Sequence, residues 1–190
     1  MKLLEEKILK EGKVLKGDIL KIDGFLNHQM DVDFLDKLAK EIYENFKNRG
    51  INKILTVESS GIGLACLTAR FFHCKVLAAK KSRSLNISEN VYHSTAFSFT
   101  HKKENTIVVS KEYLSQDDVV LIVDDFLASG NACLALRDIA RQAGATIAGV
   151  SCAVEKTYQG GRKALEDLGL TVVSLAKIGE MKDGKIDFID

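Results

Sequence analysis

The chain has 190 residues, of which 46% are hydrophobic and 28% are charged. This composition is that of a folded globular protein, and it excludes an intrinsically disordered chain or a membrane-embedded one. Lys and Arg number 27 against 26 Asp and Glu, so the net charge of +1 provides no long-range field to attract nucleic acid or an anionic membrane.

We therefore expect a single compact domain over residues 1–190, with neither nucleic acid nor a membrane as partner. In the N-terminal MKLLEEKILKEGK, charges interrupt the apolar residues too often for a signal peptide. No stretch approaches the roughly 18 apolar residues of a membrane span, so we expect a cytoplasmic protein. Four cysteines show no CxxC spacing and no His partner at metal-like spacing, which predicts small buried residues in a reducing compartment: Cys66, Cys74, Cys133 and Cys152.

Residues 32–46 predict an amphipathic helix, with Asp31 or Asp33 as its N-cap. Apolar side chains recur there at helical spacing, at Leu35, Leu38, Ile42 and Phe46.

From residue 54 onward, apolar runs alternate with helix-compatible stretches. The first strand–helix–strand unit consists of ILTV (54–57), the turn ESSGIG, a helix from Leu64 to Phe72 and the run KVLAA. The second unit consists of VVLIV (119–123), DDFLASG, a helix from Asn131 to Ala143 and TIAGVSCAV. A third unit continues with GGRKALEDLG and TVVSLAKI. This alternation predicts an α/β fold with a mostly parallel sheet covered by helices on both faces.

Residues 80–111 separate the first two units and contain strand-like pieces, VYHSTAFSF and TIVVS, but no amphipathic helix. A helix-free insertion of this length in an α/β domain is usually a protruding hairpin or a mobile lid over a site. We favour a lid at about residues 81–106.

Ligands of open α/β sheets bind beyond the carboxyl ends of the strands, which directs attention to the turns after ILTV and VVLIV. In DDFLASGNA, two aspartates are predicted to leave the strand, and small residues then lead directly into a helix. Amides at a helix N-terminus suit a phosphate, and two carboxylates suit a pair of sugar hydroxyls. The stretch thus predicts a sugar-phosphate site; the alternative is a solvated turn in which Ser129 caps the helix.

The stretch VLIVDDFLASGNA resembles the phosphoribosyl pyrophosphate (PRPP) motif of type I phosphoribosyltransferases, in which a hydrophobic strand and two acidic residues precede Thr or Ser and Gly. Ser129 stands where Thr is common and keeps the hydroxyl. The resemblance implies that Asp124 and Asp125 are the catalytic pair and bind the ribose hydroxyls. It also implies that the 5′-phosphate is bound by Ala128, Ser129, Gly130, Asn131 and Ala132.

ESSGIG occupies the position of the family's pyrophosphate loop, which implies that the amides of Ser59, Ser60 and Gly61 face the diphosphate. A dinucleotide fingerprint is disfavoured, because Cys66 holds the third glycine position and no acidic residue ends KVLAAKK. The resemblance further implies that Lys81 approaches the pyrophosphate when the lid closes. It implies that Mg²⁺ arrives chelated by PRPP, with no separate metal site on the protein.

A closer resemblance, over essentially all 190 residues, is to the xanthine-using branch of this family. The stretches that carry this resemblance are GDILKIDGFLNHQMD, VESSGIGLA, VDDFLASGNA and VEKTYQGGR. It implies that Leu20, Asn27 and Lys156 line the site of the base, within a hood of about residues 1–30 and 155–190. An amide and an ammonium group can donate to the two oxo groups of xanthine. The implied enzyme is a homodimer that transfers the 5-phosphoribosyl group of PRPP to N9 of xanthine, giving xanthosine 5′-monophosphate and pyrophosphate.

Two alternatives stay open. The first is a PRPP-binding, purine-responsive transcriptional regulator of the same fold, although neither length nor charge indicates an added DNA-binding domain or a basic surface. The second is a phosphoribosyltransferase for another 6-oxopurine, because the shared motif does not specify the base.

Overall fold

The computed structural model describes residues 1–17, 19–82, 90–98, 103–182 and 184–189. An eight-stranded sheet forms its centre, in the order β10-β9-β8-β7-β3-β4-β6-β5. The strands are β3 (Lys53–Val57), β4 (Lys75–Ser82), β5 (Val91–Ser98), β6 (Lys103–Ser110), β7 (Val119–Leu127), β8 (Thr146–Lys156), β9 (Val172–Lys182) and β10 (Lys185–Ile189). The strands from β9 to β4 in this order are parallel, whereas β10, β6 and β5 pair antiparallel with their neighbours. The predicted, mostly parallel sheet is confirmed.

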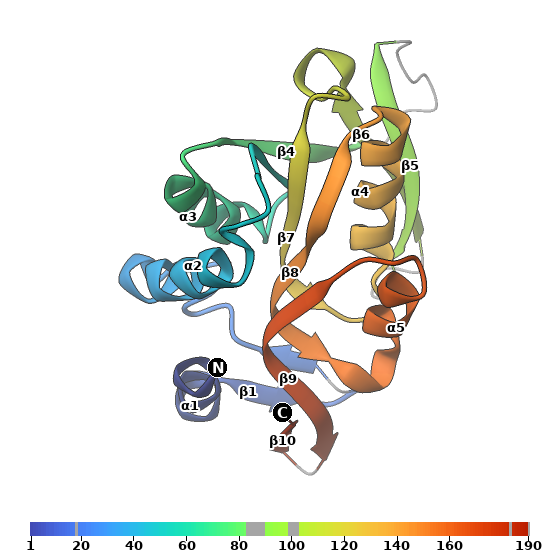
Figure 1. Ribbon diagram of the computed structural model, residues 1–190. Coiled ribbons are helices and arrows are strands. Elements are labelled where there is room, and N and C mark those ends of the chain that lie inside the picture. The colour runs from blue at the N-terminus through green and yellow to red at the C-terminus, as the bar shows by residue number, and fades with distance from the viewer. Residues whose placement is uncertain (18, 83–89, 99–102, 183, 190) are drawn as a thin grey trace.

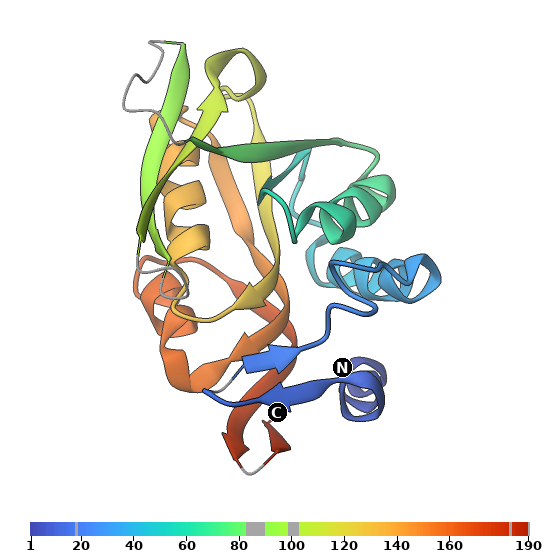
Figure 2. The same ribbon diagram turned by 180° about the vertical axis from the view of Figure 1, so that it is seen from behind.

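Helices cover both faces of the sheet, as predicted (Figures 1 and 2). The helices are α1 (Lys2–Glu11), α2 (Val32–Phe46), α3 (Ile62–Phe72), α4 (Asn131–Gln142) and α5 (Gly161–Glu166), with short 3-10 turns at η1 (Lys111–Tyr113) and η2 (Thr157–Gln159). Helices α2 and α3 lie on one face, and α4 and α5 on the other. Two apolar clusters result, one on each face, and together they form the core.

Helix boundaries follow local capping chemistry. The Asp31 side chain accepts a hydrogen bond from the Phe34 N–H at 3.1 Å, so Asp31 is the N-cap of α2. Helix α4 starts at Asn131 as predicted, after Gly130 with a φ of 80°, a conformation that glycine adopts at little cost. Among the residues that the structure describes, no side chain caps α4, so the alternative role of Ser129 as a cap is wrong.

Strand β7 is longer than predicted. Val120, Leu121, Ile122 and Val123 are fully buried, because β3 and β8 flank the strand and helices cover both faces. The strand does not end at Val123: its pairing with β8 continues to Leu127. The expectation that the two aspartates leave the strand is therefore wrong, since both lie within it.

The insertion between the first two units contains a β-hairpin. Strands β5 and β6 pair antiparallel along their full lengths, and β6 continues the sheet beside β4. The hairpin is attached to α4 through Gln142, whose amide donates to the His93 carbonyl at 2.7 Å. Residues 83–89 and 99–102 of the predicted lid lie outside the described residues, so a lid movement stays a prediction.

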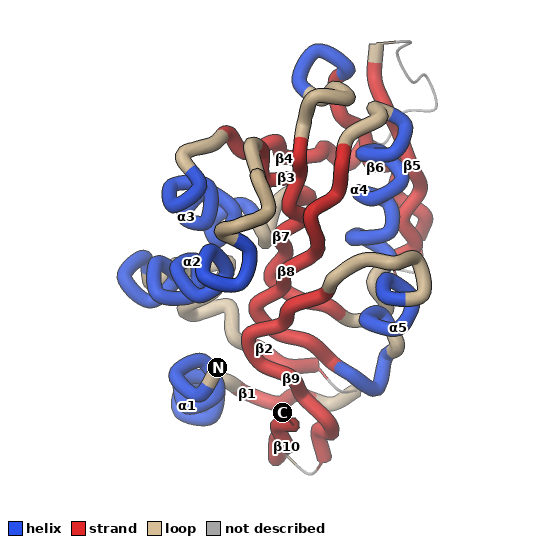
Figure 3. The backbone as a smooth tube through the Cα atoms, in the orientation of Figure 1, coloured by secondary structure: helices blue, strands red, loops and turns tan. Residues whose placement is uncertain are grey.

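Several elements were not predicted. Helix α1 leads into a two-stranded ribbon of β1 (Lys13–Leu15) and β2 (Ile19–Lys21), and β10 turns back on β9 at the other end of the chain (Figure 3). The N-terminal amine donates to the Leu175 carbonyl of β9, which ties the first and last parts of the chain together. The hood of about residues 1–30 and 155–190 stays a prediction.

The cysteines are all free thiols, but their predicted burial holds only in part. Cys133 and Cys152 are buried, Cys74 is partly buried and Cys66 is exposed, because Cys66 lies on the outer side of α3. Within the described ranges, no helix is both long and apolar enough to span a membrane.

Candidate active site

The side chain of Asp125 joins three of the predicted site segments. Its Oδ2 accepts a hydrogen bond from Asn27 Nδ2 at 2.6 Å, and its Oδ1 accepts one from Ser60 Oγ at 2.9 Å. Asn27 precedes α2, Ser60 lies in the turn between β3 and α3, and Asp125 lies in β7. The fold thus brings the predicted base, pyrophosphate and ribose segments together at one place.

Asp124 is buried directly beside Asp125 in β7. Its side chain is only 5% exposed, and its Oδ1 accepts a hydrogen bond from the Asp125 N–H at 2.9 Å. Burial, and then the charge of Asp125, raise the pKa of Asp124 well above its usual range. A carboxylate in this position is stabilised by any ligand that donates hydrogen bonds or brings positive charge.

Gly61 lets the predicted pyrophosphate turn, residues 58–63, lie directly against this carboxylate. A Cβ atom on Gly61 would stand 2.9 Å from Asp124 Oδ1 and 2.5 Å from Thr56 Oγ1, which is closer than real Cβ contacts. The Thr56 hydroxyl is buried and has no hydrogen-bond partner within the described residues. A larger residue at this point would therefore displace the Thr56 and Asp124 side chains.

The predicted phosphate loop, residues 128–132, connects β7 to the first turn of α4. The Ala128 carbonyl accepts from the Gly161 N–H at 3.0 Å, and the Gly130 carbonyl accepts from the Leu134 N–H at 2.8 Å. The first N–H groups of a helix have no partners within that helix, and the helix dipole makes this end positive. The loop therefore has the backbone geometry of an anion site.

The predicted pyrophosphate turn is attached to the start of the predicted lid through Glu58, which sequence reasoning missed. Glu58 Oε1 accepts from the Lys81 N–H at 2.7 Å, and Glu58 Oε2 lies 3.3 Å from Lys80 Nζ. The N–H of Lys81, helped by the charge of Lys80, lowers the pKa of Glu58. Lys81 is thus linked to the turn through its backbone, and its side chain is exposed.

The other two predicted base residues occupy different surroundings. Lys156 is the last residue of β8 and is partly buried, and its neighbour Glu155 pairs with Leu127 at the end of β7. Lys156 therefore lies on the edge of the sheet that carries the phosphate loop. Leu20 lies on the β1–β2 ribbon, where it is buried in the apolar cluster that also contains Phe25 and Val154.

Sequence reasoning also missed an ion pair next to the phosphate loop. Glu155 is 1% exposed, and Arg162 donates to it from Nε at 2.9 Å and from Nη2 at 2.6 Å. The same guanidinium donates to Glu166, to the Val172 carbonyl and to Ser174. The only sequence signal was a Glu and an Arg on either side of a Gly-Gly pair in VEKTYQGGR.

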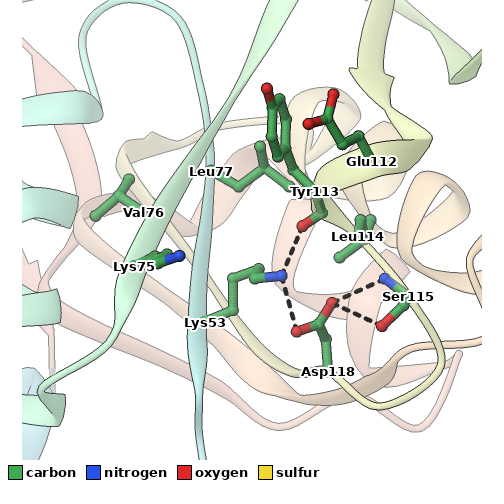
Figure 4. Close-up of a pocket in the computed structure, with 9 residues that line it drawn as sticks. All are labelled: Lys53, Lys75, Val76, Leu77, Glu112, Tyr113, Leu114, Ser115 and Asp118. Atoms are coloured by element: carbon green, nitrogen blue, oxygen red, sulfur yellow. Dashed lines mark hydrogen bonds and ion pairs between the residues drawn. The ribbon is translucent and has the colours of Figure 1, made fainter.

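A separate hollow of about 320 Å³ lies at the amino edge of the sheet, where β3 and β4 begin (Figure 4). Lys53 Nζ points toward two other lining residues: it lies 2.8 Å from Asp118 Oδ1 and 2.6 Å from the Tyr113 carbonyl oxygen. The lining residues, all from the described part of the chain, include none of the predicted site residues: Lys53, Lys75, Val76, Leu77, Glu112, Tyr113, Leu114, Ser115 and Asp118.

Comparison with known proteins identifies the family to which the chain belongs. Residues 22–178 match the phosphoribosyl transferase domain family. The chain is 49% identical to the xanthine phosphoribosyltransferase of Clostridium novyi over 188 residues, which is 99% of each chain. It is 46% identical to the xanthine phosphoribosyltransferase of Staphylococcus aureus over 189 residues, covering 100% of this chain and 98% of the other.

Solved structures agree on the fold. The APRTase of Giardia lamblia, complexed with 9-deazaadenine, matches with a TM-score of 0.80 at 24% identity, covering 93% of this chain and 98% of that one. The adenine phosphoribosyltransferase of Rhodothermus marinus matches with a TM-score of 0.76 at 20% identity, covering 94% and 100%. The chain belongs to the phosphoribosyl transferase domain family and has the type I phosphoribosyltransferase fold.

Proposed function

We propose that the protein transfers the 5-phosphoribosyl group of PRPP to N9 of xanthine, giving xanthosine 5′-monophosphate and pyrophosphate. The pair of hydrogen bonds on Asp125, from Asn27 and from Ser60, carries the proposal. A transferase must hold a base, a ribose and a leaving pyrophosphate side by side, and these contacts bring the three corresponding segments together. The nearly full-length identity to enzymes named xanthine phosphoribosyltransferase supports xanthine as the base.

Asp124 and Asp125 act on the ribose. Two adjacent carboxylates offer acceptors for two vicinal hydroxyls, and each charge-assisted hydrogen bond contributes about 1.5–3 kcal/mol. In the free protein Asp125 accepts from two neutral groups. Ribose hydroxyls are donors of the same kind, so they can replace or join these partners without leaving the carboxylate unsatisfied.

The amides of residues 128–132 hold the 5′-phosphate, and those of Ser59, Ser60 and Gly61 hold the departing pyrophosphate. Breaking the bond at the anomeric carbon leaves positive charge on the ribose and negative charge on the leaving group. Such a reaction requires positioned charges and dipoles rather than a protein nucleophile.

The carboxylates of Asp124 and Asp125 are also suited to a hard divalent cation bound through PRPP, because two neighbouring carboxylates repel each other and oxygen is the preferred ligand of Mg²⁺. When bound, Mg²⁺ supplies positive charge that offsets the charge of the departing pyrophosphate.

For the base, Asn27 and Lys156 supply the donors. The Asn27 amide has two N–H groups, of which one is directed to Asp125 and the other can serve an oxo group of xanthine. The Lys156 ammonium serves the second oxo group, and Leu20 contributes apolar surface to the hood. We also propose that Lys81 closes over the pyrophosphate with the lid, that two chains form a homodimer and that the enzyme works in the cytoplasm.

A pyrophosphate-release assay with PRPP, Mg²⁺ and one purine base at a time tests the proposal. Release with xanthine should far exceed release with hypoxanthine, guanine or adenine. Equal rates with guanine would instead indicate an enzyme for 6-oxopurines in general. No release with any base, together with binding of PRPP, would indicate a PRPP-responsive regulator.

A further inference from the structure

We propose that Gly161 and Arg162 are positioning residues for the phosphate loop, and that they set the affinity for the 5′-phosphate without touching it. This inference rests on the proposed role of residues 128–132. It adds a second part of the chain, the start of α5, to what determines the geometry of the site.

The main chain at Gly161 packs against the main chain of the loop. Its N–H donates to the Ala128 carbonyl at 3.0 Å. A Cβ atom at this position would stand 2.3 Å from the Ala128 oxygen, 2.7 Å from the Gly130 nitrogen and 2.9 Å from the Ser129 carbonyl carbon. All three are backbone atoms of the loop, so no side-chain rotation can relieve the contact.

The contact is close from the other side as well. A Cβ atom on Gly130 would stand 3.2 Å from the Gly161 Cα and 3.2 Å from its carbonyl oxygen. The two glycines therefore let two backbone segments approach each other more closely than side chains would allow. One of these segments carries the amides that we assign to the phosphate.

Arg162 fixes Gly161 in this place. Its guanidinium makes a bidentate pair with Glu155 of β8 and also reaches the Val172 carbonyl and Ser174 of β9. A planar, two-pronged pair of this kind holds direction as well as distance. Glu155 in turn pairs with Leu127 of β7, the residue before the loop. The contacts therefore form a closed circuit, which runs from β7 through the loop, Gly161 and Arg162 to β8 and back to β7.

Gly161→Ala tests the role of the close approach. Gly161 does not have a positive φ, so alanine adds contact with the loop but no left-handed strain. A displacement of catalytic groups by about 1 Å can cost about 100-fold, and we expect ribose 5-phosphate to bind about 10- to 100-fold more weakly. The readout is the dissociation constant from calorimetry, together with KM for PRPP, which should rise more than kcat falls.

Inorganic pyrophosphate is the internal control, because its proposed site is the turn at Ser59–Gly61, for which no contact with Gly161 is observed among the described residues. Its affinity should not change in Gly161→Ala, whereas a general loosening of the fold would weaken both ligands. Gly24→Ala is the matched variant: Gly24 also lacks a positive φ, and no described atom lies within 4 Å of its Cβ position. It should bind both ligands like the wild type.

Arg162→Lys provides an independent test, and it decides the matter if Gly161→Ala does not fold. Lysine keeps the charge beside Glu155 but loses the two-pronged geometry. Ribose 5-phosphate should then bind several-fold more weakly, again without a change for pyrophosphate. Wild-type affinity for ribose 5-phosphate in the folded variants would overturn the positioning role. Failure of the wild-type protein to bind ribose 5-phosphate would instead overturn the proposed function.

Discussion

The acids at the two edges of the central sheet, Asp118 at the amino edge and Asp124 at the carboxyl edge, have pKa values shifted in opposite directions. At the amino edge, the Asp118 carboxylate is paired with Lys53 and accepts from the Ser115 N–H at 2.8 Å. Burial would raise the pKa of Asp118, but the hydrogen bonds from Lys53 and Ser115 outweigh it and lower the pKa. At the carboxyl edge, burial and a second carboxylate raise the pKa of Asp124.

The difference links the acid at the amino edge to the stability of the fold and the acid at the carboxyl edge to the proposed function. Asp118 gains from the folded state, because it meets a cation there (Figure 4). Asp124 loses by folding, because it is placed beside another acid. An arrangement that disfavours the free protein is typical of a site whose ligand supplies the missing interactions. Changes at the two edges should therefore affect different measurements.

The largest effect should come from Asp125→Asn. The substitution removes the negative charge that we assign to the ribose hydroxyls, and a charged acceptor contributes about 1.5–3 kcal/mol. Affinity for ribose 5-phosphate in calorimetry should fall by about 10- to 100-fold. The amide can still accept from Ser60, and removal of the repulsion with Asp124 offsets the weakened contact with Asn27, so the thermal midpoint should change little. Undiminished affinity would remove Asp125 from the ribose site.

Asp118→Asn should give the reverse pattern. It breaks the partly buried pair with Lys53, so we expect the free energy of unfolding in urea to fall by about 1–3 kcal/mol. Binding of ribose 5-phosphate should match the wild type. Because the pKa of Asp118 is lowered in the folded protein, its contribution is present above the ordinary carboxyl pKa and is lost as the pH falls through the lowered value. A loss of ligand affinity would contradict the separation of the two edges.

Asn27→Ala sharpens the account of the carboxyl edge. It removes the donor that we assign both to Asp125 and to the base, and a single hydrogen bond contributes about 0.5–1.5 kcal/mol. KM for xanthine should rise by about 2- to 10-fold in steady-state assays. If KM for xanthine stayed constant while stability fell, Asn27 would be a structural residue only.

The subtlest effect is a pH dependence due to Asp124. Its folded pKa is raised, so the folded state holds the proton more tightly than the unfolded state does. The stability of the ligand-free protein should therefore decrease as the pH rises from the ordinary carboxyl range through the raised pKa. Asp124→Asn should lack this component of the decrease when urea unfolding is followed across that range. Identical pH profiles would show that Asp124 is not strained by burial.

The sequence predicted the elements whose patterns are local. The apolar run of β7, the helical spacing of α2 and the small residues before α4 each depend on neighbours in the chain, and each was found. The end of β7 was misplaced because its length is decided by pairing with β8, which the sequence of β7 does not contain. Helix α1 has mixed charges and apolar residues, and its formation depends on packing against the sheet.

The same division applies to the site. Asp124, Asp125 and the loop after them were predicted from a contiguous motif, and Asn27 and Ser60 from resemblance. The structure adds the hydrogen bonds that bring Asn27 and Ser60 to Asp125, over sequence separations of 98 and 65 residues. The contact of Gly161 with Ala128 could not be predicted from the sequence. A close approach of two backbones requires a glycine, but the glycine does not indicate which segment it contacts.

A crystal structure of the protein with ribose 5-phosphate tests the difference between the edges most directly. The account predicts the phosphate at the amides of residues 128–132 and the ribose hydroxyls within hydrogen-bonding distance of Asp124 and Asp125. A ligand bound instead in the amino-edge hollow, beside Lys53 and Lys75, would contradict it.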